Sequence, residues 1–204
     1  MIRAIAFWAA VIGYLLLLVM IVVGGAAWPG YSHTGQFISE LGASGAPHGR
    51  LVSLGGFLPV GLCLTLFPVL AAFIPPRSGL RVAGFALLAL FALGYIAAAV
   101  FPCDAGCRST TPSFAQMMHN LFGLLGYLGG PIGLILLGFA ARRWPDAAWL
   151  FPLGVACGVV ALAAFVVMLA EPPFGGLVQR VLEGAVAAWT LACAFALRRA
   201  PAPR

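Results

Sequence analysis

The chain has 204 residues, of which 63% are hydrophobic and 8% are charged, and its formal net charge is +6. A water-soluble domain of this length cannot bury so much apolar surface, because its surface is large relative to its volume. The composition therefore excludes a soluble globular protein and predicts a chain whose main solvent is lipid.

Six apolar segments are long enough to cross a bilayer as helices, which takes about 20 residues each. They are approximately Ile5–Ala27, Leu51–Ile74, Leu80–Phe101, Met117–Ala141, Trp149–Ala170 and Leu177–Leu197. A helix satisfies its own backbone hydrogen bonds, which lipid cannot do for it. The first segment is longer than the apolar region of a cleavable signal peptide, so we expect it to be retained. No charged run or Ser-rich linker divides the chain, and we predict an all-α fold, a single six-helix transmembrane bundle over residues 1–204.

The basic residues predict the orientation in the membrane. All eleven are arginines, and they lie at the edges of the apolar segments. An even number of helices places both termini on one side, and eight arginines share it: Arg3, Arg77, Arg81, Arg142, Arg143, Arg198, Arg199 and Arg204. The other side carries Arg50, Arg108 and Arg180. Because cytoplasmic loops carry the excess of basic residues, we expect cytoplasmic termini in the cell membrane. The aromatic–basic pattern of nucleic-acid binding is absent, so no such partner is expected.

The loop after the first segment has the pattern of a short amphipathic helix. On a helix, three apolar residues would share one face and three polar residues would lie beside it, at positions i, i+3 and i+7. The apolar residues are Phe37, Ile38 and Leu41, and the polar ones are His33, Gln36 and Glu40. We therefore expect a short interfacial helix. Its polar edge would either form part of a site or simply face water, and the pattern does not distinguish the two.

The loop after the third segment contains two cysteines, Cys103 and Cys107, on the side of the membrane where disulfides persist. A bridge between them, with Gly106 allowing the chain to turn, would hold Asp104 at the end of the third helix. A zinc site is the weaker alternative, because two cysteines alone do not complete tetrahedral coordination. The spacing therefore favours a disulfide.

The fourth segment begins with a capping-box pattern, Ser113-Phe114-Ala115-Gln116, which places His119 within the first two turns of a helix. A single histidine is often a structural group whose hydrogen bonds are satisfied. In a membrane helix, however, a polar residue is a functional candidate. We therefore include His119 among the candidate site residues.

The sixth segment begins with Arg180 and Glu183, which are spaced i, i+3 on one helix. This spacing favours an ion pair inside the bundle that fixes the last helix. The alternative is that these two residues bind a ligand, with Arg180 holding an anionic head group.

Several short strings, in this order and spacing, resemble the bacterial and archaeal membrane family called domain of unknown function 998. They are Tyr31-Ser32-His33, Ser39-Glu40-Leu41-Gly42, Phe101-Pro102-Cys103-Asp104 with Cys107, His119-Asn120, Gly176-Leu177 and Gln179-Arg180. The resemblance covers nearly the whole chain. It implies a six-helix membrane protein whose marked positions include Ser39, Glu40, Cys103, Asp104, Cys107, His119 and Arg180, and it implies no settled activity.

The polar residues of the outer loops predict a polar pocket on the extracytoplasmic side. The first hypothesis is an enzyme that hydrolyses a lipid or lipid-linked substrate, with Ser39 as nucleophile, His119 as base and Asp104 as the group that orients it. Glu40 is a further catalytic candidate. In a second version a divalent metal activates water, and its candidate ligands are His33, His48, His119, Asp104 and Glu40. No HExxH or GxSxG motif supports either version.

The alternative hypotheses are not enzymatic. The protein could be a lipid-sensing or partner-binding membrane subunit, whose outer loops form a recognition surface. A small transporter is less favoured, because charged groups at the middle of the membrane are missing. A haem protein is less favoured too, because all three histidines crowd one face. Membrane lipids are the expected partners in each case.

Overall fold

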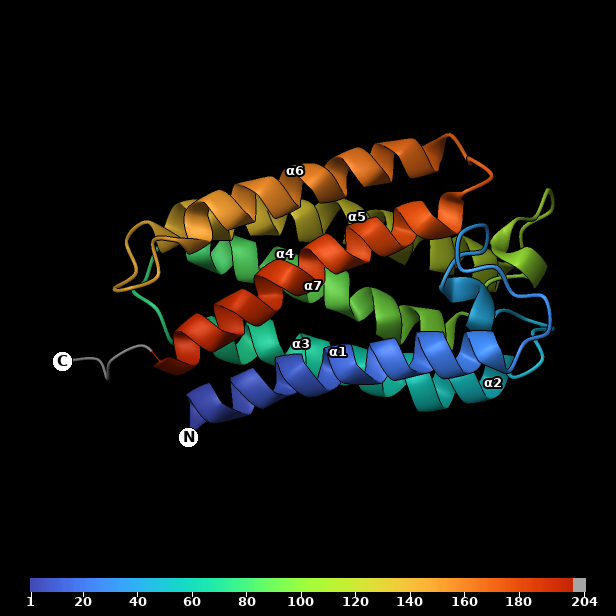
Figure 1. Cartoon of the computed structure of the whole chain (residues 1–204), viewed down its shortest axis with the longest axis horizontal. Helices are drawn as coiled ribbons and strands as arrows, with labels where there is room; N and C mark the ends of the chain where they lie inside the picture. Colours follow the sequence, from blue (N-terminus) through green and yellow to red (C-terminus); the bar gives the residue numbers. More distant parts are fainter. Residues whose placement is uncertain (200–204) are drawn as a thin grey trace.

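The computed structural model describes residues 1–199 and confirms the six predicted membrane-spanning helices (Figure 1). They are α1 (Ile2–Ala26), the continuous span Gly49–Ala71, α4 (Gly79–Val100), α5 (Phe114–Ala141), α6 (Leu150–Leu169) and α7 (Gly175–Arg199). The described residues contain no strand. Arg204, which contributes to the predicted orientation, lies outside the described residues.

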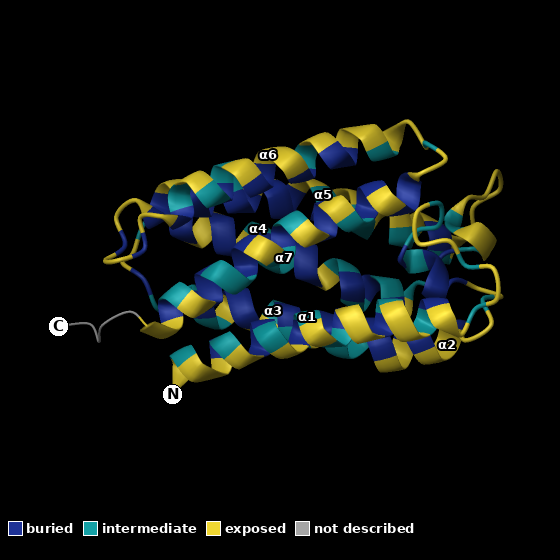
Figure 2. Cartoon of the chain, viewed as in Figure 1, coloured by how far each residue is buried: buried dark blue, intermediate teal, exposed yellow. Residues whose placement is uncertain are grey.

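The helices form a closed ring in chain order. α1 packs on α3, which is the longer part of the second span, and each later helix packs on the one before it until α7 returns to α1. The N-terminus and the last described residues lie at one end of the bundle, and the long loops lie together at the opposite end, which we call the loop end (Figure 1). Many exposed residues along the helices are large and apolar. The buried faces of the helices meet inside the ring (Figure 2). This pattern suits a bundle whose solvent is lipid.

The second span is interrupted near the loop end. A short α2 (Gly49–Val52) is followed by a five-residue π-helical turn, η2 (Ser53–Phe57), and then by α3 (Leu58–Ala71). Pro59 lies in the first turn of α3, and its ring cannot donate a hydrogen bond to the preceding turn. The wider turn accommodates the proline, and it allows Ser53 Oγ to donate to the Gly42 carbonyl oxygen at 3.1 Å.

The short helix predicted in the first loop takes the form of a single 3-10 turn, η1 (Ser39–Gly42). Its apolar residues turn inward: Ile38 and Leu41 are each only 2% exposed. Glu40 is buried with them. The segment 36–42 therefore covers the loop end of the ring, and we call it the plug.

The two helices of the α5–α6 hairpin pack closely in the half of the bundle near the termini. A Cβ atom on Gly158 would lie 2.8 Å from the Pro131 carbonyl oxygen, and one on Gly154 would lie 2.8 Å from that of Leu134. Only glycine permits such an approach of two backbones. Trp189 of α7 is hydrogen-bonded to the same region: its indole N–H donates to the Leu150 carbonyl oxygen at 3.1 Å.

The variant Gly154→Ala tests this packing. Its methyl group would meet backbone atoms of α5, and overpacking of this kind typically costs about 1–3 kcal/mol. We expect a lower unfolding temperature in detergent, even though alanine has the higher helix propensity. Gly184→Ala is the matched control, because nothing lies within 4 Å of its added Cβ atom. Equal or greater stability of the Gly154 variant would contradict close α5–α6 packing.

Candidate functional site

Arg180 clamps the first loop onto α7. Its Nη1 donates to the Gln36 carbonyl oxygen at 3.0 Å and to that of Gly176 at 2.9 Å. Its Nη2 donates to the Tyr31 hydroxyl at 2.9 Å and to His33 Nδ1 at 3.2 Å. Because arginine only donates, His33 Nδ1 must be an acceptor in this pair. Burial raises the pKa of Tyr31, and the hydrogen bond from Arg180 opposes that rise.

The predicted ion pair between Arg180 and Glu183 does not form. The one ion pair among residues 1–199 joins Arg108 and Glu171, whose closest N and O atoms are 4.0 Å apart. Arg180 faces the first loop, whereas Glu183 faces α4 and α5. A spacing of i, i+3 makes a contact possible, but these side chains find stronger partners in other elements.

Glu40 is held by the plug itself. Its Oε1 accepts the Phe37 backbone N–H at 2.9 Å, and its Oε2 accepts the Gln36 amide at 3.0 Å. Gln36 in turn accepts the Ser32 backbone N–H at 2.9 Å. The carboxylate therefore satisfies donors of a turn that lacks regular helical hydrogen bonds, which is a structural role.

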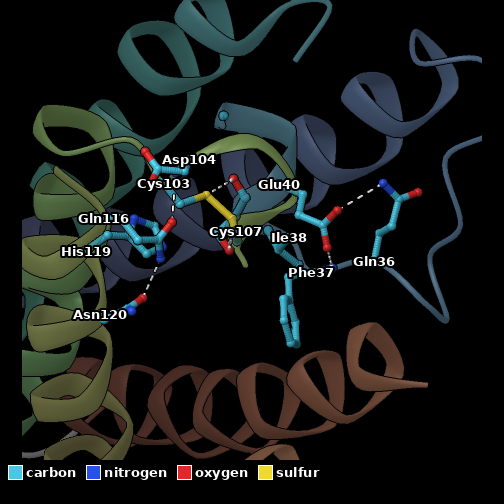
Figure 3. Close-up of a disulfide and its surroundings, with 12 residues drawn as sticks. Gln36, Phe37, Ile38, Glu40, Cys103, Asp104, Cys107, Gln116, His119 and Asn120 are labelled. Carbon is cyan, nitrogen blue, oxygen red and sulfur yellow. Dashed lines mark hydrogen bonds between the residues drawn. A yellow bond between two sulfur atoms is a disulfide. The ribbon is translucent and has the colours of Figure 1, made fainter. Parts of the chain in front are cut away.

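The two predicted disulfide cysteines have their sulfurs at bonding distance, with a Cα–Cα separation of 4.9 Å. Figure 3 shows the disulfide between side chains of α5, including His119, and the plug residues Ile38 and Glu40. Cys103 is fully buried, and its carbonyl oxygen accepts the Ser44 backbone N–H at 2.8 Å. The disulfide loop is thus joined directly to the first loop.

Asp104 caps the start of α5. Its two carboxylate oxygens accept the Ser113 backbone N–H at 3.0 Å and the Ser113 hydroxyl at 2.7 Å. These hydrogen bonds lower the pKa of Asp104 below its ordinary value. The Asp104 backbone N–H donates to Gln116 Oε1 at 2.8 Å, so the loop and the first turn of α5 hold each other.

His119 lies half-buried beside the disulfide, with Nδ1 at 3.0 Å from the Phe101 carbonyl oxygen. A carbonyl oxygen only accepts, so Nδ1 carries the proton and Nε2 of the neutral ring has a free lone pair. An atom of the ring that could bind a metal lies within 4.8 Å of both sulfurs. The three form the one group of this kind among the described residues, and bonded sulfurs offer no thiolates to a metal.

A buried carboxyl group lies deeper in the bundle. Glu183 Oε2 accepts the Tyr95 hydroxyl at 2.5 Å, and Oε1 accepts the Tyr127 hydroxyl at 3.0 Å. Gln179 donates to the Tyr127 oxygen at 2.6 Å, and its own carbonyl oxygen accepts the Ile38 backbone N–H at 2.6 Å. A continuous hydrogen-bonded chain therefore runs from the plug to Glu183. Because both carboxyl oxygens accept, the arrangement is one that a carboxylate satisfies.

A cavity of about 340 Å³ joins the disulfide to this carboxyl group. Its wall is largely aromatic, with Phe37, Phe91, Phe122 and Phe165, and its polar lining includes Ser39, Cys107, His119, Tyr95, Tyr127, Gln179 and Glu183. Asn120, Leu124 and Leu169 also line it and are exposed. Arg108 and Glu171, two exposed loop residues, line it as well. The cavity therefore opens beside the loop ends of α5 and α6, next to these two loops.

The structure brings some of the predicted site residues together and separates others. Cys107, Ser39 and His119 meet at the cavity, but no hydrogen bond joins His119 to Ser39 or Asp104, so a hydrolytic triad is not assembled. The metal ligands considered from the sequence do not form a cluster: His33 and His48 are exposed, and Glu40 and Asp104 are engaged within their own loops.

Tyr95, Tyr127 and Gln179 are functional candidates that the sequence reasoning missed. In a hydropathy pattern a tyrosine counts as one more aromatic residue, so the two hydroxyls gave no signal. Gln179 is a polar residue inside a membrane helix. The rule that such residues are functional candidates, applied to α7, would have marked it.

A ring of six membrane helices with a polar-floored cavity at one end defines a multi-pass integral membrane protein. The chain belongs to the family described as Protein of unknown function (DUF998), which matches residues 11–196. No curated protein and no solved structure matches the chain.

The variant Arg180→Lys tests the clamp. A lysine cannot span acceptors on both the loop and α7, and a hydrogen bond to a charged group contributes about 1.5–3 kcal/mol. We expect amide hydrogen exchange in the segment Tyr31–Leu41 to accelerate about tenfold or more. Arg50→Lys, at an exposed arginine of the same end, is the control. Unchanged exchange would mean that the loop is held without Arg180.

Proposed function

We propose that the protein binds a membrane-soluble amphiphile, a lipid or lipid-linked molecule with an uncharged or cationic head, in the loop-end cavity. The observation that carries the proposal is the cavity itself, which combines an aromatic wall, a hydrogen-bonding floor and a rim that includes exposed apolar residues of α5 and α6. Small-molecule sites are generally apolar cavities of this size with a few placed polar groups.

The opening suits a ligand that arrives through the membrane. Leu124 is 45% exposed and Leu169 is 64% exposed, and both border the cavity on the flank of the bundle. α5 and α6 touch through glycines in the other half of the hairpin, whereas here the cavity lies between them. An apolar tail could therefore remain in lipid while the head enters.

The floor favours a head that donates hydrogen bonds. Glu183 presents a buried carboxyl group whose oxygens already accept from Tyr95 and Tyr127. A hydroxyl or amine can add a further donor to these oxygens, whereas a carboxylate head has no donor to offer them. An uncharged or cationic head is thus the better complement.

Binding is better supported than hydrolysis. Ser39 Oγ lies 3.4 Å from Cys107 Sγ and has no hydrogen-bonded base. An activated nucleophile needs a base within reach, and that base needs a third group to orient it. In the described part of the chain, no hydrogen bond joins Ser39 to His119 or to another base, so the first of these requirements is not met.

We also infer that the loop end faces away from the cytoplasm, in the cell membrane. Arginines gather at the opposite end, where Arg198 lies over the ring of Phe7 and Arg142 over that of Phe151. This is the bias of cytoplasmic ends. The disulfide at the loop end fits an oxidising compartment.

The variant Gly123→Phe tests binding. Gly123 lines the cavity and has nothing within 4 Å of an added Cβ atom, so a benzyl group can fill the space without a clash at its base. We expect N-phenyl-1-naphthylamine, an uncharged probe whose emission rises in apolar surroundings, to bind the wild type and to lose at least about tenfold in affinity, or about 1.4 kcal/mol, in the variant. Gly184→Phe, at an equally open position outside the cavity, should bind as the wild type does. Equal binding by all three proteins would refute the proposed site.

The variant Glu183→Gln tests the choice of head group. Dodecanol and dodecylamine should displace the probe from the wild type at concentrations about tenfold below dodecanoate, because their heads donate to the carboxyl group and dodecanoate does not. In the variant the amide offers a donor, so this preference should shrink. A wild-type protein that prefers dodecanoate would contradict the proposed role of Glu183.

A further inference from the structure

We propose that the Cys103–Cys107 pair is redox-active and that the cavity ligand is a quinone, which accepts two electrons and two protons from the reduced pair. This inference rests on the proposed function, since it names the chemical class of the amphiphile. A quinone has an uncharged flat head and a long apolar tail, and quinones are the electron acceptors that keep thiols oxidised in the bacterial envelope.

The disulfide is a poor structural crosslink. It joins positions only four residues apart within one loop, and the closure of so short a loop removes little entropy from the unfolded chain. The loop is already held by the Asp104–Ser113 cap, by Gln116 and by Ser44. The bond is therefore not needed to position the loop, which leaves its chemistry to be explained.

The two sulfurs differ in solvent accessibility, as thiol–disulfide exchange requires. Cys103 is fully buried, whereas Cys107 is half-buried and lines the cavity. Cys107 also has a backbone φ of +51°, a left-handed conformation that residues other than glycine rarely adopt. Strain of this kind is characteristic of functional positions. Cys107 is thus the sulfur that an incoming group attacks, and Cys103 is the one that leaves.

A base lies beside the pair. One ring nitrogen of His119 lies within 4.8 Å of both sulfurs. Because Nδ1 donates to the Phe101 carbonyl oxygen, Nε2 carries the lone pair that can accept a thiol proton. The Ser39 hydroxyl lies 3.4 Å from Cys107 Sγ. A thiolate is the reactive form of cysteine, so a base that removes the thiol proton accelerates transfer.

The cavity provides polar groups for both ends of the quinone ring. Aromatic walls suit a flat head, and the Asn120 amide, whose oxygen is occupied by Gln116, keeps its N–H donors for a quinone carbonyl. After reduction the ring carries hydroxyl groups, and these can donate to Glu183 at the floor. The hydrogen-bonded chain from Glu183 through Tyr127 to Gln179 provides contacts for a proton at that end.

The complete cycle balances. An external dithiol attacks Cys107 as a thiolate, the S–S bond breaks, and Cys103 leaves and takes a proton. The second external thiol then displaces Cys107, and the dithiol departs as a disulfide. The two protein thiols next give two electrons and two protons to the quinone, which leaves as a quinol while the Cys103–Cys107 bond forms again.

The test uses the purified full chain in proteoliposomes, without oxygen, with dithiothreitol as the dithiol and a benzoquinone that bears one isoprene unit and no ring hydrogen, so that thiols reduce it and do not add to it. Loss of the quinone's ultraviolet absorbance should be catalysed by the wild type and should fall to the uncatalysed rate in Cys103→Ser and Cys107→Ser. Cys63→Ser, at a cysteine outside the cavity, should behave as the wild type does. His119→Gln should be slower by about a hundredfold, and its deficit should narrow as the pH rises, because thiolate then forms without the base.

A second measurement needs no variant. Wild-type protein reduced with dithiothreitol, freed of reagent and mixed with the quinone should lose maleimide labelling of two cysteines and yield one quinol per chain. Quinone that displaces the naphthylamine probe but never reoxidises the pair would overturn the redox inference and leave the proposed binding function intact. A quinone that fails to displace a probe held in the cavity would also overturn the inference. A reduced pair that retains one zinc ion and transfers no electrons would show a metal site instead.

Discussion

Lipid cannot hydrogen-bond, and every polar group placed within the bundle has to find its partner in the protein. The polar side chains at the inner end of the cavity obey this constraint through a chain of contacts. Glu183 is satisfied by Tyr95 and Tyr127, and Gln179 joins Tyr127 to the backbone of the plug. The fold can hold a carboxyl group at this depth because three helices and a loop converge on it. The same convergence produces the polar floor of the cavity.

α7 organises the loop end because two rows of its residues contact different parts of the structure. Gly176 and Arg180, four residues apart, face the first loop, and Gln179 and Glu183, also four apart, face the cavity. A Cβ atom on Gly176 would collide with the backbone of Gln36, so glycine is required where the loop meets the helix. One helix therefore fixes the plug on one side and presents the carboxyl group on the other.

The helices and the disulfide could be predicted from the sequence, because both depend on local information. Apolar length determines the spans, and the short Cys103–Cys107 spacing suggests a bridge. The partners of Arg180 and Glu183 could not be predicted, because spacing along a helix does not say how that helix is rotated within the ring. The inward orientation of the plug could not be predicted either, since it depends on a hydrogen bond from Ile38 to Gln179, 141 residues away. The pattern of Phe37, Ile38 and Leu41 indicated an apolar face, but not what would cover it.

The chain of hydrogen bonds from Ile38 to Glu183 has a consequence for how the two sides of the plug communicate. A head group that draws the Glu183 carboxyl away from Tyr127 removes the acceptor of the Tyr127 hydroxyl, to which Gln179 donates, and Gln179 in turn accepts from the plug. By thermodynamic linkage this coupling is reciprocal. A molecule that displaces the plug from outside changes the affinity of the cavity for its ligand by some factor, and the bound ligand changes the affinity of the plug for that molecule by the same factor. If the proposed ligand binds, occupancy of the cavity and displacement of the plug are therefore coupled in both directions.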